Sequence, residues 1–248
     1  MKFRMKALAV AALAAVSGVA NATIDNGQTG NGELFLLAYD TTSQQTYSFD
    51  TGLLMSALTP TGVSPQSFAL TGFDSFLATA TAATIRWGVY AVDRLAPTSL
   101  YTTAAAGAAA TNPNLTKINN TNGALASFIN DANQRGNHAS DANGYFLQSS
   151  APFGPTDFSY GGNILGANGN FSSNLSFNTT GGLTDKLDFL RFTAGNPAGS
   201  TRTAFDTTYH WSLSGTNLIY APVPEPGTYA LMLAGLLTLG AVARRRSK

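Results

Sequence analysis

Short stretches in which apolar and polar residues alternate recur along most of the chain. Alternation with a period of two places one face of a β-strand on a core. The pattern predicts strands over residues 33–39, 46–49, 67–70, 84–92, 144–148, 174–178, 186–192, 208–213 and 217–220. Gly, Pro, Asn and Asp, which favour turns, separate these stretches. The sequence therefore predicts a domain built mainly of β-strands.

The alternation is clearest between residues 86 and 92. One face of this strand would carry Trp87, Val89 and Ala91, and the other Arg86, Gly88 and Tyr90. Strands that are buried on one face only are typical of antiparallel sheets. We therefore expect an all-β fold, mainly an antiparallel sandwich or jelly-roll-like arrangement.

One segment, residues 122–131, has helical spacing instead. Its apolar residues Leu125, Phe128 and Ile129 recur at intervals of three and four. Asn122 is suited to cap the start, and Gly136 follows the end. One short helix is therefore expected there. The Ala-rich run at 104–110 fits either a loop or a second short helix, and the Gly- and Asn-rich stretch at 161–182 fits loops or a flexible ribbon.

The N-terminus has the order of features found in secretory signal peptides. A basic stretch at residues 1–6 precedes an apolar run at 7–16, and Ala20-Asn21-Ala22 supplies small residues for a signal peptidase. Ten apolar residues in a helix span only about 15 Å, against a bilayer core of about 30 Å. We therefore predict cleavage between Ala22 and Thr23 rather than a membrane anchor.

The C-terminus has a different order of features. Val223-Pro224-Glu225-Pro226-Gly227 precedes an apolar segment at 228–243, which is followed by Arg244, Arg245 and Arg246. Proline disfavours helix and keeps the first part extended. The apolar segment would span about 24 Å as a helix, which is marginal for a bilayer, and arginines favour the cytoplasmic side. We expect transient insertion into the inner membrane.

This C-terminal order resembles the PEP-CTERM sorting signal, over residues 223–248 only. The resemblance implies that an exosortase, a membrane-embedded cysteine transpeptidase, processes the chain in a Gram-negative bacterium that makes exopolysaccharide. Pro224, Glu225 and Pro226 would be its recognition site. The three arginines would form the cytoplasmic stop, which keeps the C-terminal end on the cytoplasmic side of the membrane. The predicted organisation is a signal peptide (1–22), an extracellular domain (23–222) and a sorting signal (223–248), with an extracellular or cell-surface location and possible contact with exopolysaccharide. An ordinary single-pass tail anchor is the alternative.

Composition narrows the possible functions of the domain at 23–222. It has seven basic and twelve acidic side chains, a net charge of −5, and no run of Lys or Arg that would bind nucleic acid. The chain contains no cysteine, which excludes disulfides, thiolate metal sites and cysteine nucleophiles. Charged residues make up only 11%, so neutral polar groups are expected to solvate the surface.

Asp50-Thr51-Gly52 is the first candidate for catalysis. Aspartic proteases use two Asp-Thr-Gly segments whose carboxyls share a proton. The nearest second copy, Asp206-Thr207-Thr208, lacks the glycine. A strand ending in an Asp/Gly turn is the preferred interpretation.

Four further groups are candidates for a site. Residues 131–137 with 141–144 resemble a calcium loop, but Arg135 stands where a ligand should be. His138 and His210 are the only histidines, and no Gly-x-Ser-x-Gly elbow accompanies them. Asp185 and Asp188 would face opposite sides of a strand, and Glu33 is the only glutamate of the domain. The aromatic residues considered for sugar stacking, although expected in the core, are Tyr90, Tyr145, Phe153, Tyr160, Tyr209 and Trp211.

The sequence therefore favours a non-enzymatic exported protein that contacts exopolysaccharide or biofilm and holds no cofactor. A secreted hydrolase with Asp50 in a carboxylate pair is one alternative. A structural or adhesive module acting through strand addition is the other.

Overall fold

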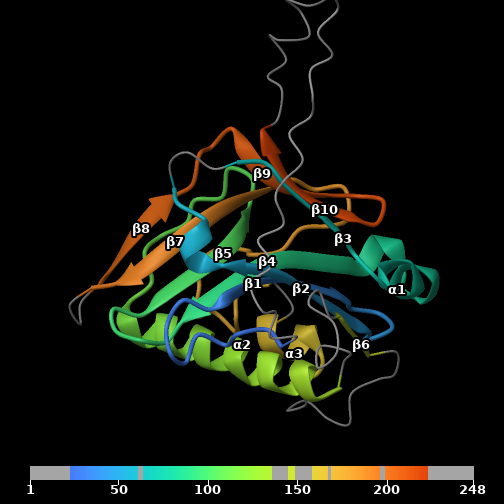
Figure 1. The fold of residues 1–248 in the computed structure, drawn as a ribbon, viewed down its shortest axis with the longest axis horizontal. Helices are drawn as coiled ribbons and strands as arrows, with labels where there is room; N and C mark the ends of the chain where they lie inside the picture. Colours follow the sequence, from blue (N-terminus) through green and yellow to red (C-terminus); the bar gives the residue numbers. More distant parts are fainter. Residues whose placement is uncertain are drawn as a thin grey trace, which may run out of the picture.

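A computed structural model describes residues 23–60, 64–135, 145–148, 158–166, 169–195 and 199–222. Within these residues every strand joins one antiparallel sheet, in the order β3-β10-β9-β7-β5-β4-β1-β2-β6, with β8 paired to β7 (Figure 1). The strands are β1 (Glu33–Asp40), β2 (Thr46–Leu54), β3 (Gln66–Ala69), β4 (Ile85–Asp93), β5 (Ser99–Ala105), β6 (Tyr145–Gln148), β7 (Leu187–Ala194), β8 (Ser200–Ala204), β9 (Tyr209–Ser214) and β10 (Asn217–Pro222). The helices are α1 (Phe73–Thr79), α2 (Leu115–Arg135) and α3 (Gly161–Leu165), with single 3-10 turns at Met55–Ala57 and Ala82–Thr84.

The mainly β, antiparallel character is confirmed, but the described strands form one curled sheet rather than two packed sheets. The physical reason is visible in β1, which is apolar at consecutive positions. Leu34, Leu36 and Ala38 belong to the core inside the curl, whereas Phe35, Leu37 and Tyr39 belong to a second core. A sheet that is apolar on both faces needs cover on both, and here the curl covers one while α2 and α3 cover the other (Figure 1).

Strand β4 repeats this arrangement and corrects the expected half-burial. Trp87, Val89 and Ala91 share the inner face as predicted. The opposite face is also buried, because Tyr90 and Val92 pack in the core beneath α2. The sequence alone could not show that a helix lies over this face.

Helix α2 is 21 residues long and includes the predicted 122–131. It begins seven residues before Asn122, so the predicted cap is wrong. Asn122 is buried in mid-helix and donates its amide N–H to the carbonyls of Asp93 and Ser99. The residue that caps α2 is Asn114, whose Oδ1 accepts the N–H of Lys117 at 2.9 Å.

Several other segments differ from the predicted elements. Strands β5 and β8 and helices α1 and α3 were not predicted. The Ala-rich run at 104–110 ends β5 and then forms a turn. Residues 174–178 form turns and bends rather than a strand, although Leu175 and Phe177 are buried in the core.

The described part of the Gly-rich stretch at 161–182 packs against β4. Trp87 and Gly181 exchange backbone hydrogen bonds of 2.9 and 3.0 Å, and the Trp87 indole donates to the Gly182 carbonyl at 2.7 Å. Gly88 permits this approach, because a Cβ there would lie 2.4 Å from the Tyr90 hydroxyl and 2.8 Å from the Thr179 carbonyl oxygen. The described part of this stretch therefore consists of helix α3 and, over residues 169–182, a loop layer packed on β4.

Asp40 ties the end of β1 to the turns around it. Its carboxylate accepts backbone N–H groups from Thr42, Ser43 and Thr81, and hydroxyls from Ser43 and Thr84. Burial alone would raise the pKa of this carboxyl, but the hydrogen bonds outweigh it and hold the pKa far below its ordinary value. Asp40 is therefore a structural anion.

Candidate functional site

The Asp50-Thr51-Gly52 segment lies inside β2 rather than at its end. The register of β1 and β2 shifts there, so that Thr51 and Gly52 form a bulge with Gly52 at φ 63°. The Gly52 N–H donates to Asp50 Oδ1 at 2.8 Å, and the Thr51 hydroxyl donates to the Leu34 carbonyl at 2.6 Å. The predicted end of the strand at this position is therefore wrong, because β2 continues through the bulge to Leu54.

Asp50 is fully buried and is not brought to Asp206. Burial, and to a smaller extent the negative charge of Glu33, raise the pKa of the Asp50 carboxyl to about 7. Asp206 lies beyond β8 and accepts the N–H and hydroxyl of Thr208, which lowers the pKa of its carboxyl. Strands β1, β4, β5 and β7 stand between β2 and β9 in the sheet order. The two aspartates do not form a protease dyad.

The proposed calcium loop is replaced by helix in its described part. Asp131 lies in the last turns of α2, and its carboxylate pairs with Arg135 at 3.1 Å. Asn137, Asp141 and Asn143 lie outside the described residues. The described ranges contain no cluster of three His, Asp or Glu side chains that would hold a metal ion.

His210 and Asp188 form a pair that sequence reasoning missed. His210 Nδ1 lies 2.9 Å from Asp188 Oδ1, and Asp188 Oδ2 accepts the N–H of Gly107. The pair joins β7 and β9, which are neighbours in the sheet although β8 lies between them in the sequence. Asp185 lies in the turn before β7 and accepts the Gly182 N–H, so it does not share a strand with Asp188. No Ser or Thr hydroxyl among the described residues bonds His210, and His138 lies outside them.

The candidate aromatic residues mostly serve the core. Tyr90, Tyr160 and Trp211 are buried, and Tyr145 and Tyr209 are half-buried against Tyr47 and Tyr220. Phe153 lies outside the described residues. None of those described forms an exposed platform for a sugar ring.

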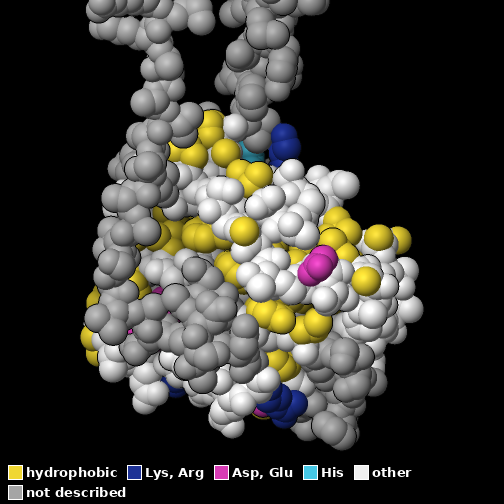
Figure 2. Space-filling view, turned by 45° about the vertical axis from the view of Figure 1, so that its right-hand side comes forward, with side chains coloured by type: hydrophobic (Ala, Val, Ile, Leu, Met, Phe, Trp, Pro, Cys, Tyr) yellow, Lys and Arg dark blue, Asp and Glu magenta, His cyan; other side chains and the backbone are white. Residues whose placement is uncertain are grey.

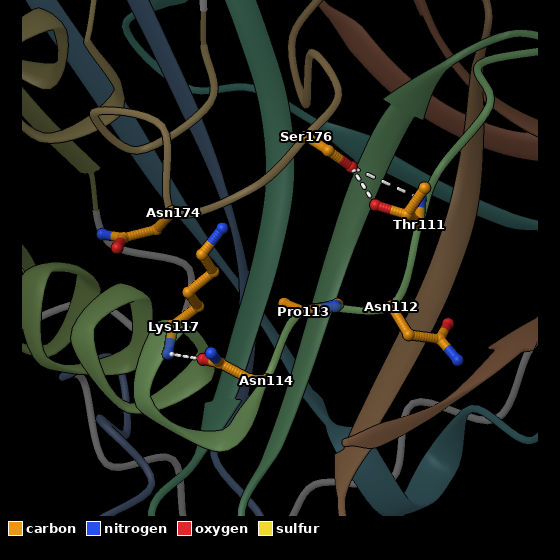
Figure 3. Close-up of a pocket in the computed structure, with 7 residues that line it drawn as sticks. All are labelled: Thr111, Asn112, Pro113, Asn114, Lys117, Asn174 and Ser176. Carbon is orange, nitrogen blue, oxygen red and sulfur yellow. Dashed lines mark hydrogen bonds between the residues drawn. The ribbon is translucent and has the colours of Figure 1, made fainter. Parts of the chain in front are cut away.

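An open polar pocket lies at the N-terminal end of α2 and has a volume of about 180 Å³ (Figure 3). We call it the Lys117 pocket; its lining residues are Thr111, Asn112, Pro113, Asn114, Lys117, Asn174 and Ser176. The Lys117 side chain extends from α2 toward the loop that carries Asn174 and Ser176 (Figure 3).

Hydrogen bonds fix two walls of the Lys117 pocket relative to each other. Ser176 Oγ bonds the hydroxyl of Thr111 and accepts its N–H, which joins the segment before α2 to the loop after α3. The Asn114 cap orients the first turn of α2. The Lys117 N–H donates to this cap, so the group in the pocket that attracts negative charge is the Lys117 ammonium. The pocket therefore offers amides, hydroxyls and one cation to a ligand.

A second pocket, of about 260 Å³, lies on another flank of α2. This Arg94 pocket is lined by Arg94, Thr98, Asn119 and Asn122. Asn122 Oδ1 is buried and has no hydrogen-bond partner in the described ranges. Sequence reasoning missed both pockets, because each brings together segments that are distant in the chain.

The surface has few charges. Figure 2 shows a face on which neutral polar groups and apolar side chains predominate, with isolated Asp, Glu, Lys and Arg. This agrees with the composition. On a surface with so few charges, cations without an acidic partner differ in chemistry from the neutral groups around them.

Comparison with known proteins identifies the C-terminal segment. Residues 222–247 match the PEP-CTERM protein-sorting motif. This match supports export and processing by an exosortase. No curated protein and no solved structure is significantly similar to the chain. No helix in the described ranges is long and apolar enough to cross a membrane.

The residues assigned to sorting lie almost entirely outside the described ranges. These are Ala20 and Ala22 at the signal-peptide cleavage site, Pro224, Glu225 and Pro226, the apolar segment 228–243, and Arg244, Arg245 and Arg246. Thr23 is the first described residue and is exposed. The cleavage site and the roles of single sorting residues remain predictions.

Proposed function

We propose that this chain, which carries a PEP-CTERM sorting motif at its C-terminus, is a non-enzymatic surface or matrix protein that binds exopolysaccharide through the Lys117 pocket. The observation that carries the proposal is the lining of this pocket. Asn, Thr and Ser side chains donate and accept hydrogen bonds, as the hydroxyls of a sugar do.

The size of the pocket also supports a polymer ligand. Pockets for drug-sized molecules have volumes of about 300–1,000 Å³, whereas the Lys117 pocket has about 180 Å³. Such a pocket suits one unit of a longer chain that continues across the surface. Affinity for the polymer would then come from several weak sites acting together.

The positions of the carboxylates support binding over hydrolysis. Asp50 has no exposed surface and lies away from Asp206, so it offers no access to a substrate. A general acid or base must come within hydrogen-bond reach of the group it serves. The Asp50 hydrolase is therefore the less supported alternative.

Strand addition is also less supported. Among the described residues the edge strands are β3, β6 and β8, which have four, four and five residues. Short edge strands offer few backbone groups to a partner strand and are a common protection against edge pairing.

The test is retention of the full chain, purified in mild detergent, on the exopolysaccharide of the host that makes it. We expect retention that weakens in Lys117→Gln and Asn174→Ala and is unchanged in Lys186→Gln. Lys186 is an exposed lysine that lines neither pocket. Absence of retention on the host polymer would contradict the proposed function.

A further inference from the structure

We infer that the ligand is an acidic glycan, whose anionic groups are held by Lys117 and Arg94 in the two pockets on α2. This inference rests on the proposed function and specifies the chemical class of the polymer. It is carried by charge distribution, by the availability of the two cations and by their placement on one helix.

The charge of this region is opposite in sign to that of the domain. Residues 23–222 carry a net charge of −5, yet no acidic residue occurs between Asp93 and Asp131. The same interval contains Arg94 and Lys117. Because charges separated by more than about 10 Å are largely screened at physiological salt, a polymer here responds mainly to the local cations.

Lys117 and Arg94 differ from most other basic residues in having no protein acceptor. The guanidinium groups of Arg86 and Arg202 donate to backbone carbonyls, and Arg135 pairs with Asp131. No ion pair or side-chain hydrogen bond engages Lys117 or Arg94 within the described ranges, and both are exposed. Their donors are therefore available to a ligand.

The backbone holds Arg94 in place while its side chain stays available. The Arg94 N–H donates to the Gly27 carbonyl at 2.8 Å. The neighbouring acid, Asp93, accepts the N–H of Leu95 on Oδ1 and does not line the pocket. A guanidinium presents a fixed fork of donors that matches a carboxylate or sulfate.

Helix geometry places the two pockets on opposite flanks of α2. Residues three or four apart share a helix face, so Asn119 and Asn122 lie together while Lys117 lies on another side. Five residues separate Lys117 from Asn122, which corresponds to about 7.5 Å along the axis. The exposed residues between the flanks are Thr116 and Asn120, both polar and uncharged. One polymer can therefore cross the helix from pocket to pocket over hydrogen-bonding groups.

Asn122 adds a feature that favours a hydroxylated ligand. Its amide nitrogen donates two hydrogen bonds, to the carbonyls of Asp93 and Ser99. These two bonds fix the plane of the side-chain amide. Its Oδ1 is buried in the wall of the Arg94 pocket without a partner in the described ranges. A buried acceptor without a donor is unfavourable, so a ligand hydroxyl that reaches it gains a hydrogen bond.

The test compares three soluble polymers for binding to the full chain: polygalacturonate, dextran sulfate and neutral dextran, with polyglutamate as an anionic polymer that is not a glycan. We expect both acidic glycans to bind, with weaker binding as salt increases. Lys117→Gln and Arg94→Gln should each weaken binding about three- to tenfold, and Lys186→Gln should not.

The outcomes separate this inference from the proposed function. Binding of neutral dextran as tightly as polygalacturonate overturns the inference and leaves glycan binding through the Lys117 pocket standing. Unchanged binding in the Lys117→Gln, Arg94→Gln double variant overturns both the inference and the assignment of the Lys117 pocket, and leaves only glycan binding by the chain standing. Equal binding of polyglutamate overturns the glycan specificity. Failure to bind any glycan, the host polymer included, overturns the proposed function itself.

Discussion

Replacing Asp50 with asparagine should make the protein more stable at neutral and alkaline pH. Burial raises the pKa of this carboxyl from 3.8 to about 7. The folded state therefore keeps a proton between about pH 4 and 7 that the unfolded state releases, so stability falls as pH rises through this window. Three pKa units at 1.36 kcal/mol each correspond to a penalty of about 4 kcal/mol at pH 8. Asparagine keeps Oδ1 as an acceptor for the Gly52 N–H and carries no charge.

The assay is urea unfolding at pH 4, 6 and 8, followed by the fluorescence of Trp87 and Trp211, which are fully buried. We expect Asp50→Asn to match the wild type at pH 4 and to exceed it by about 4 kcal/mol at pH 8. Asp74→Asn, on the exposed side of α1, is the control and should change stability by less than about 0.5 kcal/mol. Equal pH profiles for Asp50→Asn and the wild type would refute the burial argument.

Three further predictions concern packing, a buried anion and sorting. Gly88→Ala should destabilise the fold by about 1–3 kcal/mol because its Cβ meets the loop layer. Gly123→Ala in α2 should stabilise the fold by about 0.5–1 kcal/mol. Chemical denaturation measures both changes, and a stabilised Gly88→Ala variant would show that the loop layer can move away from β4. Asp40→Ala should lower the stability of the fold by several kcal/mol at pH 7. In the wild type, the stabilisation that the Asp40 carboxylate provides should be lost as pH falls below about 4, because the lowered pKa means that the folded state favours the ionised carboxyl. A melting temperature unchanged by the substitution at pH 7 would contradict the role of Asp40 as a structural anion. Replacing Pro224, Glu225 and Pro226 with alanine should abolish C-terminal processing. Mass spectrometry of the extracellular wild-type protein measures this processing. A wild-type protein that still ends at Lys248 would contradict processing by an exosortase.

Alternation of apolar and polar residues predicted the elements whose packing is regular. Strands β1, β4, β7, β9 and β10 lie close to their predicted positions. Where both faces of a strand are buried, as in β1, the alternation gives way to a run of apolar residues. The same pattern could not distinguish a sandwich from one curled sheet, because that difference depends on which strands pair.

Helix α2 shows why boundaries were harder to predict. Its first turns are rich in Thr and Asn, which have low helix propensity. Asn122 was interpreted as a cap because asparagine favours that position, yet packing against β4 and β5 buries it inside the helix. The actual cap, Asn114, directly follows Pro113. The strand predicted at residues 174–178 was wrong for a related reason. Leu175 and Phe177 are buried as they would be in a strand, but they anchor a turn.

The candidate site could be predicted less well than the fold. The interpretation of Asp50 as structural, which rests on the lack of a second Asp-Thr-Gly, stays a prediction. The two pockets have no local signature. The Lys117 pocket forms only when residues 111–117 lie beside residues 174–176 in the folded structure. The Asp188–His210 pair likewise forms only when β7 lies beside β9 in the sheet.

The place of β10 in the sheet determines how the protein bears mechanical load. Pairing continues to Pro222, two residues before the Pro-Glu-Pro sequence, and β10 is hydrogen-bonded to β9 on one side and to β3 on the other. If the chain is anchored through its C-terminus, shear flow on a bound polymer would pull along a strand held by two ladders at once. Force would then be resisted by many backbone hydrogen bonds in parallel, and trimming the chain beyond residue 222 would leave that grip intact.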